Sequence, residues 1–202
     1  MADQEFWQVL HSRRSVRRFQ PQPVPEDVVR RILEAATWAP SAHHRQPWRF
    51  AVLASLEARS RLAQALGDAF RQDLRADGLS SDQVEAQVVR SHQRIEQAPL
   101  AIMLCLDQSA GDTYPDASRQ QSEHWMGVQS VALAGGNLLL AASAEGLGSV
   151  WMCAPLFAPA VAIQALDLPP EWQPQALILL GYPAKIPDPR PRRPLAEVTL
   201  YY

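Results

Sequence analysis

The chain has 202 residues, of which 47% are hydrophobic and 20% are charged, and its formal net charge is -2. This length suits one domain with a substantial core, and the near-neutral charge excludes a nucleic-acid-binding protein, which needs a broad basic surface. Neither a long uncharged apolar run nor a basic-then-apolar N-terminus is apparent, so the sequence predicts a cytoplasmic protein without a membrane span or signal peptide.

Four helices and one strand are expected in the first half of the chain. Apolar residues recur at helical spacing, and Pro25 and Pro40 delimit the second helix. The segment RFAVLA has the short apolar composition of a buried strand. The expected helices cover 5–11, the stretch between the two prolines, 56–75 and 80–97, and the expected strand covers 49–54.

The second half is expected to hold the core of the fold. The continuous apolar run LAIMLCLD at 100–107 predicts a central strand covered on both faces. The Ala- and Leu-rich stretch 118–144 predicts a long helix buried nearly all round. Gly135 and Gly136 inside it indicate the close approach of another backbone or a flat ligand. The remaining elements expected are a turn and short strand within 145–155, a helix at 157–166 and a buried strand at 175–182.

After Gly181 the chain becomes proline-rich. Segment 183–194 cannot form regular structure, whereas EVTLYY at 197–202 regains the alternating pattern of a strand. That strand could pair with a strand of its own chain or complete the sheet of a partner subunit. The extended arm before it favours pairing with the partner. We expect one α+β domain over 1–202, with helices around a central mixed sheet and residues 186–202 as a C-terminal arm.

The cysteines and the basic residues restrict the chemistry. Cys105 and Cys153 form no C-x-x-C pair, which excludes a zinc ribbon or dithiol motif, and both are predicted to be buried small hydrophobic residues. Lys185 is the single lysine, and every other basic side chain is arginine. This usage favours bidentate binding of phosphate or carboxylate over Schiff-base catalysis.

The segment SRRSVRRF at 12–19 is the most unusual local feature. It places four arginines and the Ser15 hydroxyl within a few residues after a predicted helix. These donors suit a phosphate with a polyol behind it. The alternative is a solvated basic surface between two helices.

Two further segments carry candidate binding residues. APSAHHRQPWRF at 39–50 places Ser41, His43 and His44 on a loop between rigid elements, with Trp48 expected in the core. The two histidines are poor metal ligands because no third ligand accompanies them, so no metal is expected. RPRR at 190–193 is either a charged tail or a second grip on the anion held by the first segment.

In this order, the segments resemble the FMN-dependent nitroreductases. RRSVRRF is similar to the family's N-terminal flavin motif, APSAHHRQPWRF to its second motif, GLGSVWMCAP to its strand beside the flavin ring, and GYPAKIPDPRPRRPLAEV to its phosphate-binding end. The resemblance spans almost the whole chain. It implies a three-layer fold and a domain-swapped homodimer that binds FMN.

Carried over residue by residue, the resemblance implies a set of FMN contacts, with Ser41 often supplied by the other subunit and no catalytic side chain named. A positive side chain such as Arg17 near the pyrimidine edge would stabilise reduced flavin. The implied FMN-binding residues are Arg13, Arg14, Ser15, Val16, Arg17, Ser41, Trp151, Met152, Cys153, Ala154 and, at the phosphate, Arg190 and Arg192.

A closer resemblance links the HHRQPW, WMCAPLFAP and LDLPPEWQPQALILLGYP segments to the flavin domain fused to the γ-glutamyl ligase of coenzyme F420 biosynthesis. It implies hydride transfer from reduced FMN to a dehydro precursor of that deazaflavin, although no ligase domain is present here. NAD(P)H or another donor would bind transiently. The alternatives are a broad nitro or quinone reductase and a non-catalytic flavin or deazaflavin-binding module.

Four residues are candidates for binding the acceptor. His43 and His44 lie on the second motif, and Arg71 and Arg75 lie on the predicted helix 56–75, where they could hold the acidic tail of a deazaflavin. For the two arginines the alternative is a surface helix with ordinary charges.

Overall fold

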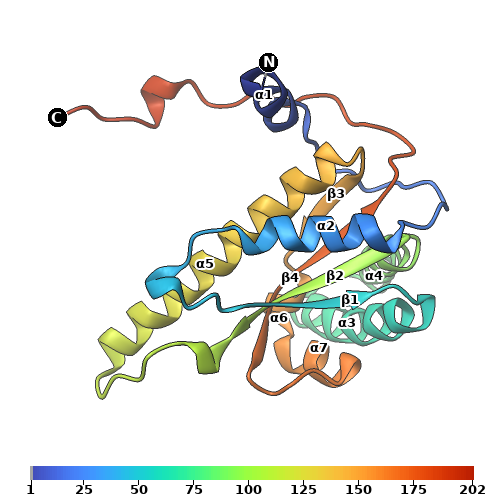
Figure 1. The fold of residues 1–202 in the computed structure, drawn as a ribbon. Coiled ribbons are helices and arrows are strands. Elements are labelled where there is room, and N and C mark those ends of the chain that lie inside the picture. The colour runs from blue at the N-terminus through green and yellow to red at the C-terminus, as the bar shows by residue number, and fades with distance from the viewer. Residues whose placement is uncertain (1) are drawn as a thin grey trace.

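The computed structural model describes residues 2–202 (Figure 1). One or two helices precede each strand along the chain, and most boundaries lie close to those expected. The helices are α1 Ala2–Ser12, α2 Glu26–Thr37, α3 Leu56–Ala76, α4 Ser81–Glu96, α5 Ala117–Ala144, α6 Ala154–Phe157 and α7 Pro159–Leu166. The strands are β1 Trp48–Leu53, β2 Leu100–Asp107, β3 Gly148–Met152 and β4 Trp172–Gly181, and short 3-10 turns are η1 Ala42–His44, η2 Gln108–Ala110 and η3 Leu195–Glu197.

The four strands form one sheet in the order β1-β2-β4-β3. Each neighbouring pair is antiparallel, so the expected mixed sheet is wrong in detail. The only parallel pairing among residues 2–202 is an isolated bridge between Ser15 and Ser149. Every residue of β2 is buried, as its apolar run predicts. The α+β layered architecture is confirmed.

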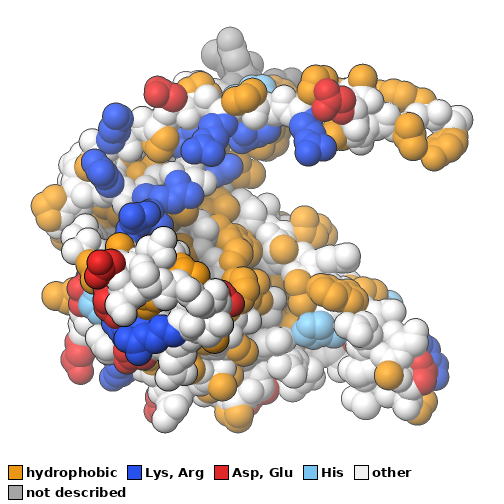
Figure 2. Space-filling view, turned by 180° about the vertical axis from the view of Figure 1, so that it is seen from behind, with side chains coloured by type: hydrophobic (Ala, Val, Ile, Leu, Met, Phe, Trp, Pro, Cys, Tyr) orange, Lys and Arg blue, Asp and Glu red, His pale blue; other side chains and the backbone are white. Residues whose placement is uncertain are grey.

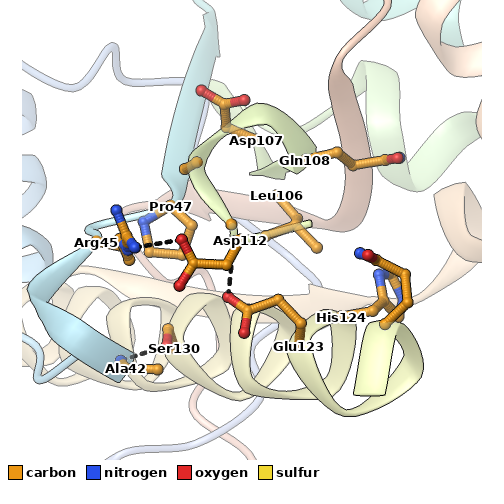
Figure 3. A pocket seen from close by; sticks show the side chains of 14 residues that line it. Ala42, Arg45, Pro47, Leu106, Asp107, Gln108, Asp112, Glu123, His124 and Ser130 are labelled. Carbon is orange, nitrogen blue, oxygen red and sulfur yellow. Dashed lines mark hydrogen bonds and ion pairs between the residues drawn. The ribbon is translucent and has the colours of Figure 1, made fainter. Parts of the chain in front are cut away.

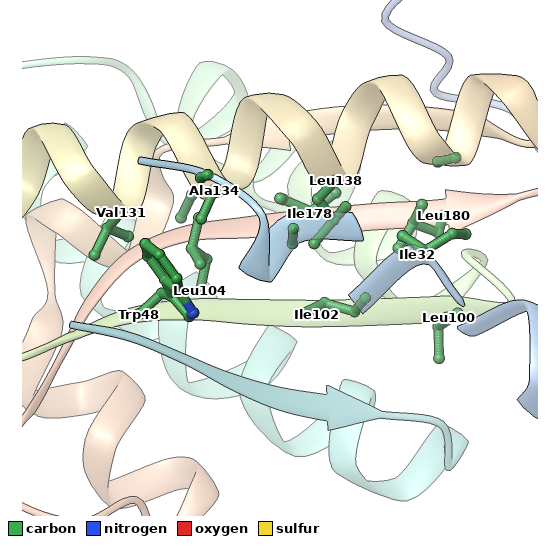
Figure 4. Packing of buried hydrophobic residues seen from close by; sticks show 14 of the residues in the cluster. Ile32, Trp48, Leu100, Ile102, Leu104, Val131, Ala134, Leu138, Ile178 and Leu180 are labelled. Carbon is green, nitrogen blue, oxygen red and sulfur yellow. The ribbon is translucent and has the colours of Figure 1, made fainter. Parts of the chain in front are cut away.

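Helices cover both faces of the sheet (Figures 1 and 4). On one face α2 and α5 pack onto alternate strand residues such as Ile102 and Ile178, with Trp48 buried as predicted. On the other face α3 and α7 pack onto the intervening residues, such as Met103 and Leu177. Because strand side chains alternate between faces, one apolar run supplies both layers of the core.

The long helix α5 differs from its prediction. It was expected to be buried nearly all round, but only 33% of the residues in its most apolar stretch of 18 are buried. The side chains of Trp125 and Leu133 are about half exposed. By length and composition alone, this helix is long and apolar enough to cross a membrane. Its inner residues Val131, Ala134 and Leu138 pack on the sheet as a core helix does. Part of its outer side packs against α1, whereas Trp125 and Leu133 face solvent within the described residues.

The two glycines of α5 occupy different environments. A Cβ at Gly135 would collide with the indole ring of Trp151 and lie 2.8 Å from Leu104, whereas a Cβ at Gly136 would meet nothing within 4 Å. The close approach at Gly135 therefore comes from a side chain, not from the backbone or flat ligand that the sequence suggested. Gly135 sets the position of Trp151, at the end of β3.

The C-terminal arm leaves the body beside the segment after α1. Gln20 donates to the Tyr182 carbonyl (2.8 Å) and Ala184 donates to the Arg18 carbonyl (3.0 Å). Beyond this point the arm extends away from the body, as the red trace in Figure 1 shows. The predicted strand at 197–202 is absent in this chain because the segment has no neighbouring strand to pair with; η3 and extended backbone take its place.

Gly135→Ala is expected to lower the free energy of unfolding by about 1–3 kcal/mol, because the added methyl overpacks the Trp151 contact. Gly136→Ala is the matched control, and it should stabilise the helix by up to ~1 kcal/mol. Urea unfolding followed by circular dichroism measures both. Equal stability of the two variants would contradict the role given to Gly135.

Candidate functional site

The arginine-rich segment lies along the edge of β3. The Val16 amide donates to the Ser149 carbonyl at 2.9 Å, and Ser15 forms the parallel bridge to Ser149. The Val16 side chain is 3% exposed and fills the space beside Gly148, where a Cβ would come within 2.7 Å of it. The first motif and the glycine-containing strand, which are far apart in sequence, therefore form one surface.

The arginines of this segment have no acidic partner among the described side chains. Within the side chains of residues 5–202, none of Arg13, Arg14, Arg17 and Arg18 forms an ion pair. Arg14 Nη1 donates to the carbonyls of His11 (2.6 Å) and Arg13 (2.8 Å), and Arg17 Nη1 donates to the Ser15 carbonyl (3.3 Å). These uncompensated positive charges suit an anionic ligand.

Helix α4 adds two arginines that the sequence reasoning missed. Partial burial, and then the positive charges of Arg17 and Arg90, lower the pKa of the Arg94 guanidinium. Phe19 and Pro99 both lie against Gly181, which fixes the segment after Arg17 next to the end of α4. Arg17, Arg90 and Arg94 are called the arginine cluster below. The only sequence signal for these two arginines was their i, i+4 spacing, which places them on one face of the helix with no acidic residue between them.

The end of β3 presents the residues expected to face the ring. Trp151 and Met152 are half-buried and Ala154 begins α6. Cys153 is exposed, so the prediction that it is buried is wrong; it lies at the break between β3 and α6. Cys105 is buried as predicted, and burial raises the pKa of its thiol to about 12.

The loop that carries Ser41 is strained. His43, His44 and Gln46 have φ values of 50°, 54° and 50°, in the left-handed region that costs non-glycine residues ~1–3 kcal/mol and is common at functional sites. Internal contacts hold the loop: the Gln46 amide donates to Ser41 Oγ (3.1 Å), and the Ala42 amide donates to Ser130 Oγ of α5 (3.2 Å).

A small polar cavity of about 100 Å³ lies beneath this loop (Figure 3). Arg45 of the loop pairs with Asp112, whose amide donates to Glu123 Oε1 at 3.2 Å. Glu123 is 7% exposed, and its Oε2 has no hydrogen-bond partner within residues 2–202. The contacts from Glu123 through Asp112 to Arg45 connect the strained loop to α5.

One chain does not bring all the predicted residues together. The 41–46 loop, between α2 and β1, lies at the opposite end of the sheet from the segment that follows α1 (Figure 1). Arg190 and Arg192 are exposed on the arm, and Arg192 Nη1 donates to the Arg190 carbonyl (3.1 Å). Figure 2 shows basic side chains along the top of the molecule and on the side where the arm joins the body, whereas mainly hydrophobic and uncharged side chains border the body side of the hollow. Convergence of both ends on one phosphate stays a prediction.

The two arginines expected to grip an acidic acceptor differ in their environment. Arg71 pairs with Glu85 (2.7 Å) and Asp68 (2.6 Å). Arg75 is 61% exposed and lies 3.9 Å from Glu85. The positive charge of Arg71 is therefore compensated inside the α3–α4 pair.

Several known proteins resemble this chain over most of its length. A "NADH dehydrogenase" from Thermus thermophilus is 34% identical over 200 residues, covering 94% of this chain and 92% of that protein. A protein from Methanothermobacter thermautotrophicus that is named "NADH dehydrogenase/NAD(P)H nitroreductase" is 31% identical over 185 residues, which cover 91% of this chain and 80% of that protein. A crystal structure from Desulfovibrio desulfuricans, assigned as a nitroreductase in complex with FMN, superposes with a TM-score of 0.74 at 30% identity and covers 98% of this chain and 96% of that one. The model of the nitroreductase family matches residues 10–182, and the chain belongs to this family.

Proposed function

We propose that the chain is an FMN-dependent oxidoreductase that passes hydride from reduced flavin to a small-molecule acceptor. The observation that carries the proposal is the packing of the unpaired arginines of segment 13–18 against β3. This packing joins donors for a phosphate and polyol to the strand end expected beside a flavin ring. The FMN complex of the Desulfovibrio protein supports the choice of cofactor.

The donor set fits FMN. Arg13, Arg14 and Ser15 would hold the phosphate and ribityl chain, with Arg190 and Arg192 closing over the phosphate from the arm. A dianionic phosphate requires fixed charge-assisted donors, and guanidinium groups without carboxylate partners supply them. Val16 would hold the segment in place through its amide and its buried side chain.

The ring would lie beside Trp151, Met152, Cys153 and Ala154. Bound FMN would supply hydride transfer, which no side chain of this protein can perform. The arginine cluster would stabilise negative charge on the pyrimidine edge, because three guanidinium groups without acids raise the local positive potential. No side-chain acid or base is assigned, and Cys153 is a neighbour of the ring, not a nucleophile.

We propose further that the active form is a homodimer in which each arm wraps around the partner. Exposed apolar residues on α1, α5 and the arm support it, because monomers rarely expose large apolar areas. These residues are Phe6, Trp7, Leu10, Trp125, Leu133, Ile186, Leu195, Val198, Leu200, Tyr201 and Tyr202. The dimer would also bring Ser41, His43 and His44 of one subunit to the flavin of the other.

The proposal also covers the electron donor that reduces the flavin and the acceptor that reoxidises it. Relatives named as NADH dehydrogenase and NAD(P)H nitroreductase support NAD(P)H as the transient donor and a broad nitro or quinone reductase. Reduction of a dehydro precursor of coenzyme F420 rests on the resemblance of three segments alone. Either activity would take place in the cytoplasm, where NAD(P)H is present.

Anaerobic reduction tests the function. Purified protein should be yellow or take up FMN, and NADH or NADPH should bleach the flavin, which menadione or a nitroaromatic compound should then reoxidise. Flavin that stays oxidised with both donors would indicate a binding module. Protein that is colourless and binds no FMN would refute the proposal.

Arg94→Gln tests the arginine cluster. Loss of a charge-assisted contact of about 1.5–3 kcal/mol should weaken FMN binding at least tenfold, while relief of repulsion from Arg17 and Arg90 should leave the apoprotein as stable or more stable. Arg30→Gln on the exposed side of α2 is the control and should change neither property. Fluorescence titration and thermal unfolding measure the two effects. Unchanged FMN affinity in Arg94→Gln would remove α4 from the site.

Deleting residues 186–202 tests the arm. The truncated chain should be monomeric and bind FMN at least tenfold more weakly, because apolar contacts and two phosphate donors are lost together. The double substitution Arg190→Gln with Arg192→Gln should weaken FMN binding without dissociating the dimer. Light scattering and FMN titration measure both variants. A truncated protein that remains dimeric and yellow would show that the arm is dispensable.

A further inference from the structure

A second, larger cavity of about 350 Å³ lies between α3, α4 and the start of α6. It is separate from the polar cavity beneath the 41–46 loop, and its surface is mainly apolar. Leu66, Phe70 and Leu74 line it from α3, and Phe157 and Ala158 line it from the opposite side. A cavity of this size with aromatic walls suits a flat organic group.

This cavity adjoins the segment proposed to face the flavin. Ala154 belongs to both, and the exposed Cys153 directly precedes it. Phe157, which lines the cavity, is 82% exposed, so the cavity opens to solvent beside this ring. An acceptor stacked on the ring beside residues 151–154 can therefore extend into this cavity without leaving the site.

The charged residues that line the cavity are both acidic. Asp73 and Asp77 lie on its wall, and neither forms an ion pair within residues 2–202. Both stand at the carboxyl end of α3, where the helix dipole disfavours negative charge. Helix stability alone would not select two carboxylates at this position.

The neighbouring arginines do not neutralise these acids. Arg71 is held by Glu85 and Asp68, and Arg75 lies nearest to Glu85 and is not part of the cavity wall. On the α4 side the wall is formed by Ser91, and the flanking Arg90 and Arg94 are not lining residues. The cavity wall is therefore mainly apolar, and the two charged side chains on it are carboxylates. This is opposite to the charge needed to hold the acidic tail of a deazaflavin.

We propose that this cavity receives the part of the acceptor that extends beyond the flavin ring, and that it selects neutral or cationic aromatic acceptors over anionic ones. Asp73 and Asp77 are the residues that determine this selectivity. The inference rests on the proposed flavin-dependent function. It specifies an acceptor class that the apolar walls would bind and the carboxylates would discriminate by charge.

The test uses the FMN-loaded full-length protein and three acceptors on one ring: 4-nitrobenzoate, 4-nitrobenzamide and 4-nitrobenzylamine. The double variant Asp73→Asn with Asp77→Asn is compared with the wild type for each acceptor, because the three differ in intrinsic reactivity. At low ionic strength, kcat/KM of the double variant relative to the wild type should rise about tenfold for the anion, fall severalfold for the cation and stay constant for the neutral amide. These changes should come mainly from KM. The effect should shrink in high salt.

Glu34→Gln on α2 is the matched control, since it removes an exposed carboxylate far from the cavity. It should leave kcat/KM for all three acceptors at the wild-type value. If the double substitution changed kcat/KM by the same factor for all three acceptors, the charge selectivity would be overturned. Ala69→Phe, which fills the cavity, should raise KM for two-ring acceptors more than for one-ring acceptors, and an equal effect on both would overturn the placement. Failure to bind or reduce FMN would instead refute the proposed function.

Discussion

The contact between Val16 and Gly148 is the constraint on which the candidate site depends. Val16 can approach β3 only because residue 148 has no side chain, and the hydrogen bond from its amide to Ser149 then sets the register of the whole segment 13–18. Any larger residue at 148 would push the arginines away from the strand. The site is therefore built on the sheet edge, and its flexible arginine side chains extend from a rigid backbone.

Local patterns predicted the elements well, because most of them follow from periodicity within a short window. The run at 100–107 and the proline-delimited helix after Pro25 appear where expected. The predictions that failed required knowledge of neighbours. The segment 197–202 has a strand pattern but no strand beside it, and the apolar surface of α5 has the composition of a core helix whether it faces its own sheet or another molecule.

The same distinction applies to the site. Arg13, Arg14, Ser15 and Arg17 are adjacent in sequence, so their density was visible at once. Arg90 and Arg94 resemble ordinary charges on a surface helix, and only the packing of Phe19 and Pro99 around Gly181 brings that helix to Arg17. The strained conformation at His43 and His44 was equally invisible, because nothing in their side chains requires a positive φ.

The α3–α4 pair arranges opposite charges at its two ends. Arg90 and Arg94 lie toward the carboxyl end of α4, where the helix dipole favours positive charge, and Asp73 and Asp77 lie at the carboxyl end of α3, near the turn that leads into α4. A single helical hairpin can thus present positive charge to a phosphorylated cofactor and negative charge to its acceptor. Ser91, which lies between Arg90 and Arg94 on α4, also lines the cavity, so the proposed selectivity requires that the carboxylates of Asp73 and Asp77 on the cavity wall outweigh the arginines behind Ser91.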